Sequence, residues 1–299
     1  MSSKISKYEH DILKTIKKHF GDSENYYSNN EYDKNAYYLK LKDFNKRFYH
    51  SMDQETKNAF DKGKGSELKG KQPKILALRS SSAMTYTLFG NYKKFKFEAN
   101  EYTDKNFEFN TDLQTIKGTN ANLDVFLKGK EKTLFFEMKM CEWLLDTPSK
   151  DISIRYFNPE NYSDSNLAEA AITCLKGIAK EPFEQYDALQ MFKHTLGIYN
   201  YFKKNIVHNN IELLNCVWKF DDKELLTSDS KKKYEESIKR EKTEIESFKK
   251  IMQPIIELFD KKFDIRLIWF SDLFEKLKIK ADTDDIKQHK SFIETKYIF

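Results

Sequence analysis

The sequence predicts a mixed α/β (α+β) fold in which a central mixed sheet is flanked by helices. Apolar residues recur at helical intervals in some segments and alternate as in strands in others. These segments follow one another as helix, three strands, helices, strand, helix and strand, an order typical of mixed folds. Only 9 glycines and 5 prolines occur among 299 residues, which argues against propellers and turn-rich sandwiches.

The first 62 residues carry helical patterns, with Ile5, Ile12 and Ile16 near a 3.6-residue period. A polar stretch over 23–35 interrupts them. The glycine- and lysine-rich residues 61–73 predict a loop, which is the best candidate for an internal boundary. The chain is therefore divided into an N-terminal helical region, 1–72, and a larger domain, 73–299, that ends in a C-terminal helical extension.

The larger domain shows a regular succession of predicted elements. In order, these are a short helix over 81–89, strands over 93–98, 121–128 and 133–140, a polar loop over 146–165, helices over 166–180 and 184–204, a strand over 211–219, a helix over 231–259 and a strand over 265–270. Pro254 is expected to kink the last helix.

Composition and charge restrict the class of protein. The net charge of +5 permits a nucleic-acid partner without requiring one. No apolar run is long enough to cross a membrane, and the N-terminus lacks the apolar stretch of a signal peptide, so we expect a cytoplasmic protein. Cys141, Cys174 and Cys216 are widely spaced, which predicts reduced thiols and no structural zinc site.

One segment nearly matches a phosphate-binding loop. Residues 65–71 have the glycines and the lysine of that motif. The Ser or Thr that would ligate magnesium is missing, and Pro73 stands where the phosphate-binding helix should begin. The segment is therefore interpreted as a plain loop. The six histidines are scattered without metal-binding spacing.

The most informative segment is a predicted hairpin that turns near Gly129. If a four-residue loop joins its strands, Lys128 pairs with Thr133 and Asp124 lies opposite Glu137. Lys139 follows Glu137 by two residues and therefore shares its face of the strand. A shorter turn would shift this register.

Two carboxylates this close repel each other unless a cation joins them. Their hard oxygen atoms suit Mg²⁺ or Mn²⁺, which can hold a phosphate and activate a water molecule. Lys139 would then orient that water and stabilise the charge of the transition state. The alternative, an exposed hairpin face with an ordinary Glu/Lys pair, explains the spacing equally well.

These residues resemble the signature of the PD-(D/E)xK nuclease superfamily, which contains restriction endonucleases and many repair and phage nucleases. Leu123 replaces the proline of the signature. A bacterial restriction-endonuclease-like group is similar over about 75–220. The segments that carry this likeness are Ser80–Gly90, Phe97-Glu98, Asn122–Asp124, Glu137–Glu142 and Gln190–Gly197. Ser82 stands where that group tends to have Gln.

The resemblance implies a role for each matching residue. Asp124, Glu137 and the intervening Met138 would hold Mg²⁺, with Mn²⁺ as a substitute, and Lys139 would be the base or charge stabiliser. Glu98 matches a further acidic position and is either an auxiliary metal ligand or a solvated strand residue. Gln190 either positions water or DNA, or is an amide on a polar helix face. His194 and Glu142 are weaker candidates for phosphate and supporting contacts.

The resemblance therefore implies a metal-dependent DNA endonuclease with a restriction-endonuclease-like core. A type II restriction endonuclease is the first choice, acting on double-stranded DNA as a homodimer, with a cognate DNA methyltransferase encoded nearby. The alternatives are a structure-specific repair or phage-associated nuclease and a catalytically inactive DNA-binding protein of the same fold. Base specificity depends on side chains that the sequence does not place.

Overall fold

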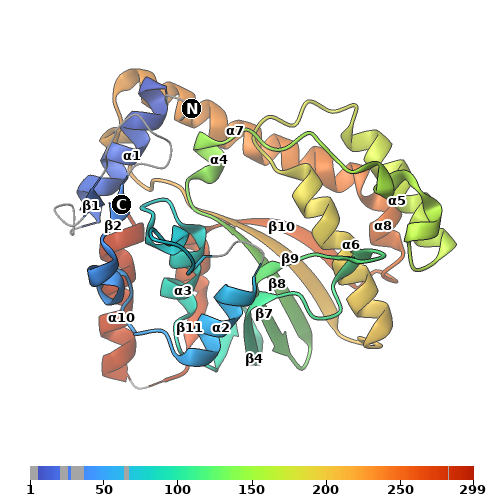
Figure 1. The fold of residues 1–299 in the computed structure, drawn as a ribbon, viewed down its shortest axis with the longest axis horizontal. Helices are drawn as coiled ribbons and strands as arrows, with labels where there is room; N and C mark the ends of the chain where they lie inside the picture. The colour runs from blue at the N-terminus through green and yellow to red at the C-terminus, as the bar shows by residue number, and fades with distance from the viewer. Residues whose placement is uncertain (1–5, 21–25, 28–36, 64–66, 282) are drawn as a thin grey trace.

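Helices cover both faces of a central mixed sheet, as the sequence predicts (Figure 1). A computed structural model describes residues 6–20, 26–27, 37–63, 67–281 and 283–299. Residues 64–66 of the predicted loop and most of the polar stretch over 23–35 lie outside these ranges.

The seven-stranded sheet is parallel at one side and antiparallel at the other. Its strands in spatial order are β10 (Phe263–Trp269), β9 (Asn210–Val217), β8 (Lys132–Lys139), β7 (Leu123–Gly129), β4 (Asn100–Phe109), β3 (Phe95–Phe97) and β11 (Leu277–Ile279). β8, β9 and β10 are parallel, and every other neighbouring pair is antiparallel. Two short two-stranded sheets are separate from it: β1 (Tyr26–Tyr27) with β2 (Tyr38–Leu39), and β5 (Gln114–Ile116) with β6 (Thr119–Asn120).

The connections explain this topology. A tight turn joins β7 to β8, so these strands must be antiparallel. Parallel neighbours need long crossovers, and helices supply them between β8 and β9 and between β9 and β10. The helices are α1 (Lys7–His19), α2 (Gln54–Lys62), α3 (Ser81–Phe89), α4 (Glu142–Leu145), α5 (Ser165–Ile178), α6 (Ala188–Lys204), α7 (Ser228–Ile251), α8 (Gln253–Glu257), α9 (Phe270–Lys276) and α10 (Thr283–Tyr297).

The sheet curls, so that strands distant in its order approach each other. Arg266 on β10 donates from Nη1 to Glu98 Oε1, 2.7 Å away, in the turn between β3 and β4. The same guanidinium lies 3.1 Å from Glu212 of β9 through Nη2. β10 is one edge of the sheet and β3 is next to the other, so this contact is possible only in a curled sheet.

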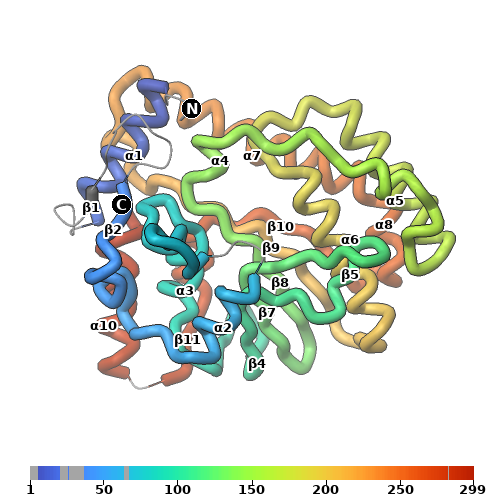
Figure 2. The backbone as a smooth tube through the Cα atoms, in the orientation of Figure 1, coloured from blue at the N-terminus to red at the C-terminus, as the bar shows by residue number. Residues whose placement is uncertain are grey.

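The two faces of the sheet carry separate apolar cores. One core includes side chains of α1, α3 and α10, and the other includes side chains of α5 to α8, in agreement with the two groups of helices in Figure 2. Ile12 and Ile16 of the N-terminal region lie in the same core as Phe136 of β8 and Trp218. Residues on both sides of the predicted boundary at 72 therefore pack together.

The elements differ from the sequence predictions in several places. Ile251 ends α7, and α8 starts again with Pro254 in its first turn, so the predicted kink is a short break. β4 was not predicted because it is polar and largely exposed along its first half, and the short elements α4, α9 and β11 were not predicted either. α10 lies in the C-terminal region that was expected to be helical, but its bounds were not predicted because it has little apolar periodicity. In the part of the chain that the structure describes, no helix is both long and apolar enough to cross a membrane. Cys141, Cys174 and Cys216 are buried and free.

Candidate active site

The hairpin of β7 and β8 has the predicted register. Val125 pairs with Phe136 and Lys128 with Thr133, which places Asp124 and Glu137 one step beyond the last pair. There the side chain of Asp124 takes the place of a strand partner, because its Oδ2 accepts a hydrogen bond of 2.7 Å from Met138 N. The regular pairing of the two strands thus ends where the carboxylates begin.

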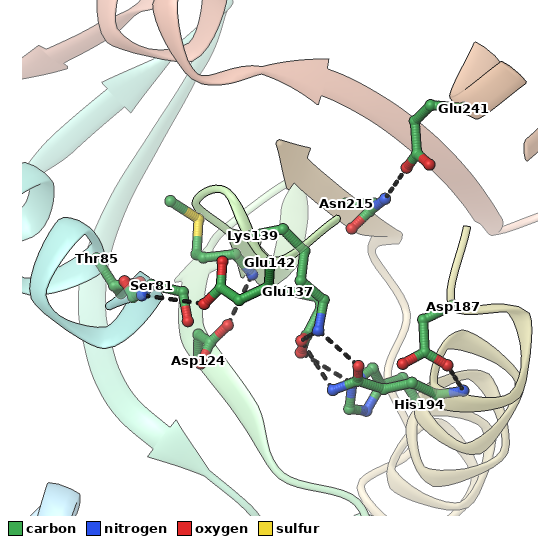
Figure 3. Close-up of polar contacts among 12 residues, drawn as sticks. Ser81, Thr85, Asp124, Glu137, Lys139, Glu142, Asp187, His194, Asn215 and Glu241 are labelled. Atoms are coloured by element: carbon green, nitrogen blue, oxygen red, sulfur yellow. Dashed lines mark hydrogen bonds and ion pairs between the residues drawn. The ribbon is translucent and has the colours of Figure 1, made fainter. Parts of the chain in front are cut away.

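Glu137 is the centre of a buried polar network (Figure 3). Its Oε1 accepts from Gln190 Nε2 and lies 2.8 Å from Lys139 Nζ, and its Oε2 is 2.9 Å from His194 Nε2. Lys139 also donates to Gln190 Oε1 at 2.6 Å. The structure thus brings Gln190 and His194, two helical residues of uncertain role in the sequence, into contact with the E-x-K strand.

Helix α6 is fixed in the position that this network requires. Gln190 and His194 are four residues apart and therefore share one face of the helix. Asp187 caps the helix by accepting a hydrogen bond of 3.0 Å from Gln190 N. The preceding backbone is held by Glu244 of α7, whose carboxylate accepts three N–H groups, those of residues 184–186. The amide and imidazole are therefore preorganised against Glu137.

Asp124, Glu137, Lys139 and Gln190 all line one cavity of about 560 Å³. Two further carboxylates line it as well, Glu67 from the loop after α2 and Glu108 from the end of β4. Sequence reasoning missed both because neither belongs to a recognisable motif. Glu108 has a positive φ of 49° and accepts a hydrogen bond from Asn122 Nδ2. A non-glycine residue in that conformation is uncommon and marks a constrained position.

The carboxylates of this cavity differ in charge state. Burial, with the charges of Glu137 and Glu108, raises the pKa of Asp124 well above its usual range. Burial also raises the pKa of Glu108 to about 7, and Glu67 adds to this effect. Burial acts in the same direction on Glu137, but Lys139 and His194 outweigh it and lower the pKa of Glu137 to about 2. Without a bound cation, the charged forms of Asp124 and Glu108 are thus disfavoured, whereas Glu137 is charged.

Lys139 is fully charged in this setting. Burial alone would lower its pKa, but the negative charges of Glu137 and Asp187 outweigh burial and raise the pKa. A proton-accepting role for the free amine is therefore unfavourable in the metal-free chain. The ammonium group is held as a fixed positive charge beside Glu137 and Gln190.

The structure does not bring Glu98 to this cavity. It lies in the turn between β3 and β4 and pairs with Arg266, and it is absent from the residues that line the cavity. The side chain of Met138 is buried in the apolar core, so only its backbone faces the carboxylates. Among the described residues, no group of three His, Cys, Asp or Glu side chains is arranged to enclose a metal ion.

A second acid lies behind the network. Glu241 of α7 is 1% exposed and accepts a hydrogen bond of 3.3 Å from Asn215, the β9 residue paired with Glu137. Its Oε2 is buried and has no hydrogen-bond partner. Burial, followed by the charge of Glu244, raises the pKa of Glu241 to about 8.

This buried acid predicts a pH dependence of stability. Between its ordinary pKa of 4.5 and about 8, the folded chain keeps a proton that the unfolded chain releases, so the free energy of unfolding falls as pH rises. The loss is at most about 1.4 kcal/mol per pH unit. Glu241→Gln keeps an acceptor for Asn215 and does not titrate, so it should remove this slope. Urea unfolding of the wild type and of Glu241→Gln from about pH 5 to 8 gives the free energy of unfolding at each pH. If this free energy changes with pH equally in both proteins, the prediction is contradicted.

Comparison of the chain with protein-family models, with curated proteins and with solved structures finds no match.

Proposed function

We propose that the chain is a metal-dependent DNA endonuclease with a restriction-endonuclease-like core. One observation carries the proposal: the acid, acid and lysine predicted from the sequence line a single cavity together with Gln190. An ordinary exposed hairpin face would leave Glu137 in solvent, whereas here it is 4% exposed and bonded to three side chains. A type II restriction endonuclease is the specific activity that we propose first.

The residues of the cavity suit Mg²⁺. Asp124 and Glu137 offer hard oxygen atoms, and Asn122 Oδ1 is buried nearby without a hydrogen-bond partner. Mg²⁺ keeps several water ligands and usually takes only one or two carboxylates, so a cage of three acidic side chains is not needed. Asp124, Glu137 and the backbone of Met138 would hold the ion. A bound Mg²⁺ neutralises phosphate charge and lowers the pKa of a water ligand.

The chain's own residues supply the remaining steps. Lys139 presents an ammonium group that stabilises the negative charge developing on the phosphate during attack by water. Gln190 keeps that group in place through a hydrogen bond of 2.6 Å. His194 holds the second oxygen of Glu137, which fixes the direction in which the carboxylate points. Preorganised charges of this kind need no rearrangement during the reaction.

The proposal predicts a conflict between stability and activity at Asp124. At pH 7 its carboxylate is unfavourable in the metal-free folded chain because burial and two acidic neighbours raise its pKa. Asp124→Asn keeps an oxygen for Met138 N, so we expect the variant to be more stable than wild type by about 1 kcal/mol in EDTA. Excess Mg²⁺ should stabilise only the wild type, by mass action. Denaturant unfolding of both proteins with and without Mg²⁺ measures both effects. If Mg²⁺ stabilises the variant as much as the wild type, Asp124 is not a metal ligand.

Incubation with supercoiled plasmid and Mg²⁺ tests the function. Discrete bands that disappear in EDTA support a restriction endonuclease, and a smear supports a nuclease without sequence specificity. DNA binding without cleavage, on many plasmids and with Mg²⁺ or Mn²⁺, would support the inactive DNA-binding protein and contradict the proposal.

A further inference from the structure

A separate wall of the cavity carries positive charge. It consists of the β5–β6 hairpin, the turn η4 (Ile154–Phe157) and α6, and it contributes Arg155 and Lys193 to the lining. Lys193 Nζ lies 6.0 Å from the ring centroid of Tyr156, the residue after Arg155. Both cations line the cavity, and Lys193 lies beside the ring of the residue that follows Arg155.

This wall is firmly built. Thr115 Oγ1 and Tyr156 OH are 2.9 Å apart, and Tyr162 OH donates to Tyr156 O at 2.5 Å. Arg155 Nη2 donates to Lys117 O, also at 2.5 Å. The hairpin also packs tightly on α6, because a Cβ at Gly197 would come within 2.9 Å of Leu113 O. The position of Arg155 is thus set by the fold and by more than one contact.

Arg155 differs from the other arginines near the sheet. Arg79, Arg240 and Arg266 each form an ion pair with a carboxylate. In the described ranges no carboxylate pairs with Arg155 or Lys193. The bond from Nη2 to Lys117 O leaves most of the guanidinium N–H groups available for an anion.

A DNA strand in this cavity needs such a site. The charged carboxylate of Glu137, together with Asp124 and its acidic neighbours once they ionise, repels a polyanion, and a metal ion would compensate this repulsion at one phosphate only. We propose that Arg155 and Lys193 bind a phosphate next to the scissile one in the same strand. Arginine is well suited to this role because its planar fork matches two phosphate oxygens. The inference rests on the proposed nuclease function and adds the residues that hold the substrate strand.

The first test is the salt dependence of DNA binding. The affinity for a DNA duplex is measured in EDTA, so that no cleavage occurs, at salt concentrations from about 50 to about 300 mM. Arg155→Gln and Lys193→Gln should each weaken binding several-fold and make the slope of log K against log salt shallower by about 1. Arg155→Lys should keep the slope and lose part of the affinity. Arg240→Gln removes an exposed guanidinium that does not line the cavity, and it should change neither quantity.

The second test locates the phosphate. Duplexes that carry one methylphosphonate near the cleavage position remove one charge at a time. At one position, the neutral methylphosphonate should weaken DNA binding by the wild type as much as the Arg155→Gln substitution does. The same duplex should bind Arg155→Gln no more weakly than the unmodified duplex does, because the substitution and the methylphosphonate remove the same contact. Full additivity at every position, or a loss in Arg240→Gln equal to that in Arg155→Gln, would overturn the inference. Unaltered cleavage and binding by Arg155→Gln would overturn the phosphate site but not the proposed nuclease function. Absence of DNA binding in the wild type would overturn both.

Discussion

The Glu137→Gln substitution should lower the rate of DNA cleavage by at least about 10³-fold and leave DNA binding intact. The substitution removes one charge from the proposed metal site, and metal-held phosphate chemistry depends on that charge. It also gives Lys139 and His194 a weaker partner than the carboxylate that now bonds both. Binding should remain because phosphate contacts along the strand supply most of the affinity. Single-turnover cleavage and filter binding measure the two quantities.

Glu98→Gln is the matched control for this substitution. Glu98 is the other acid that the resemblance placed near the metal, but in the structure it pairs with Arg266 in the turn between β3 and β4. It should therefore retain nearly full cleavage. Loss of binding and folding together in Glu137→Gln would mean that Glu137 is only structural. If Glu98→Gln folds but does not cleave DNA, Glu98 contributes to the metal site after all.

Lys139→Met should lower cleavage by about 10²- to 10³-fold, as expected when one stabilising charge leaves a preorganised site. Lys139→Arg should retain measurable activity, because it keeps the charge but changes its shape and donor geometry. The raised pKa of Lys139 supports higher activity in Lys139→Arg than in Lys139→Met, because a charged ammonium group stabilises an anion and does not accept a proton. The cleavage rates of the three proteins, measured with Mg²⁺ in excess, decide between the two roles.

The opposite result for Lys139 is equally informative. Wild-type activity in Lys139→Met would exclude a catalytic role for this lysine and remove much of the support for the nuclease proposal. Met keeps most of the apolar stem, so thermal unfolding of the variant checks that the cavity is intact.

The core of the candidate site could be predicted because it depends on local rules. The register of β7 and β8 follows from the length of one turn and from the alternation of side chains, which is why Asp124 and Glu137 line the same cavity. Gln190 and His194 face one way because they are a helical turn apart. Such relations need no knowledge of how distant segments pack.

Other parts of the site depend on tertiary structure and were not predicted. Glu67 and Glu108 reach the cavity from an irregular loop and from the end of a polar strand, where the sequence shows no period. The resemblance placed Glu98 near the metal, but the curl of the sheet brings Glu98 to Arg266 instead. Glu241 belongs to α7, where the tertiary packing of the helix buries it and brings it to Asn215.

Cleavage of one plasmid by wild type and by Asp124→Asn, titrated side by side with Mg²⁺, tests the central claim most directly. The Asp124 variant keeps the hydrogen-bond acceptor for Met138 N and lacks only the charge. We expect wild type to cut with a rate that rises and saturates with Mg²⁺, and the folded variant to be inactive at every concentration. Cleavage by wild type that is independent of Mg²⁺, or equal cleavage by Asp124→Asn, would contradict the assignment of this cavity as the active site of a metal-dependent nuclease.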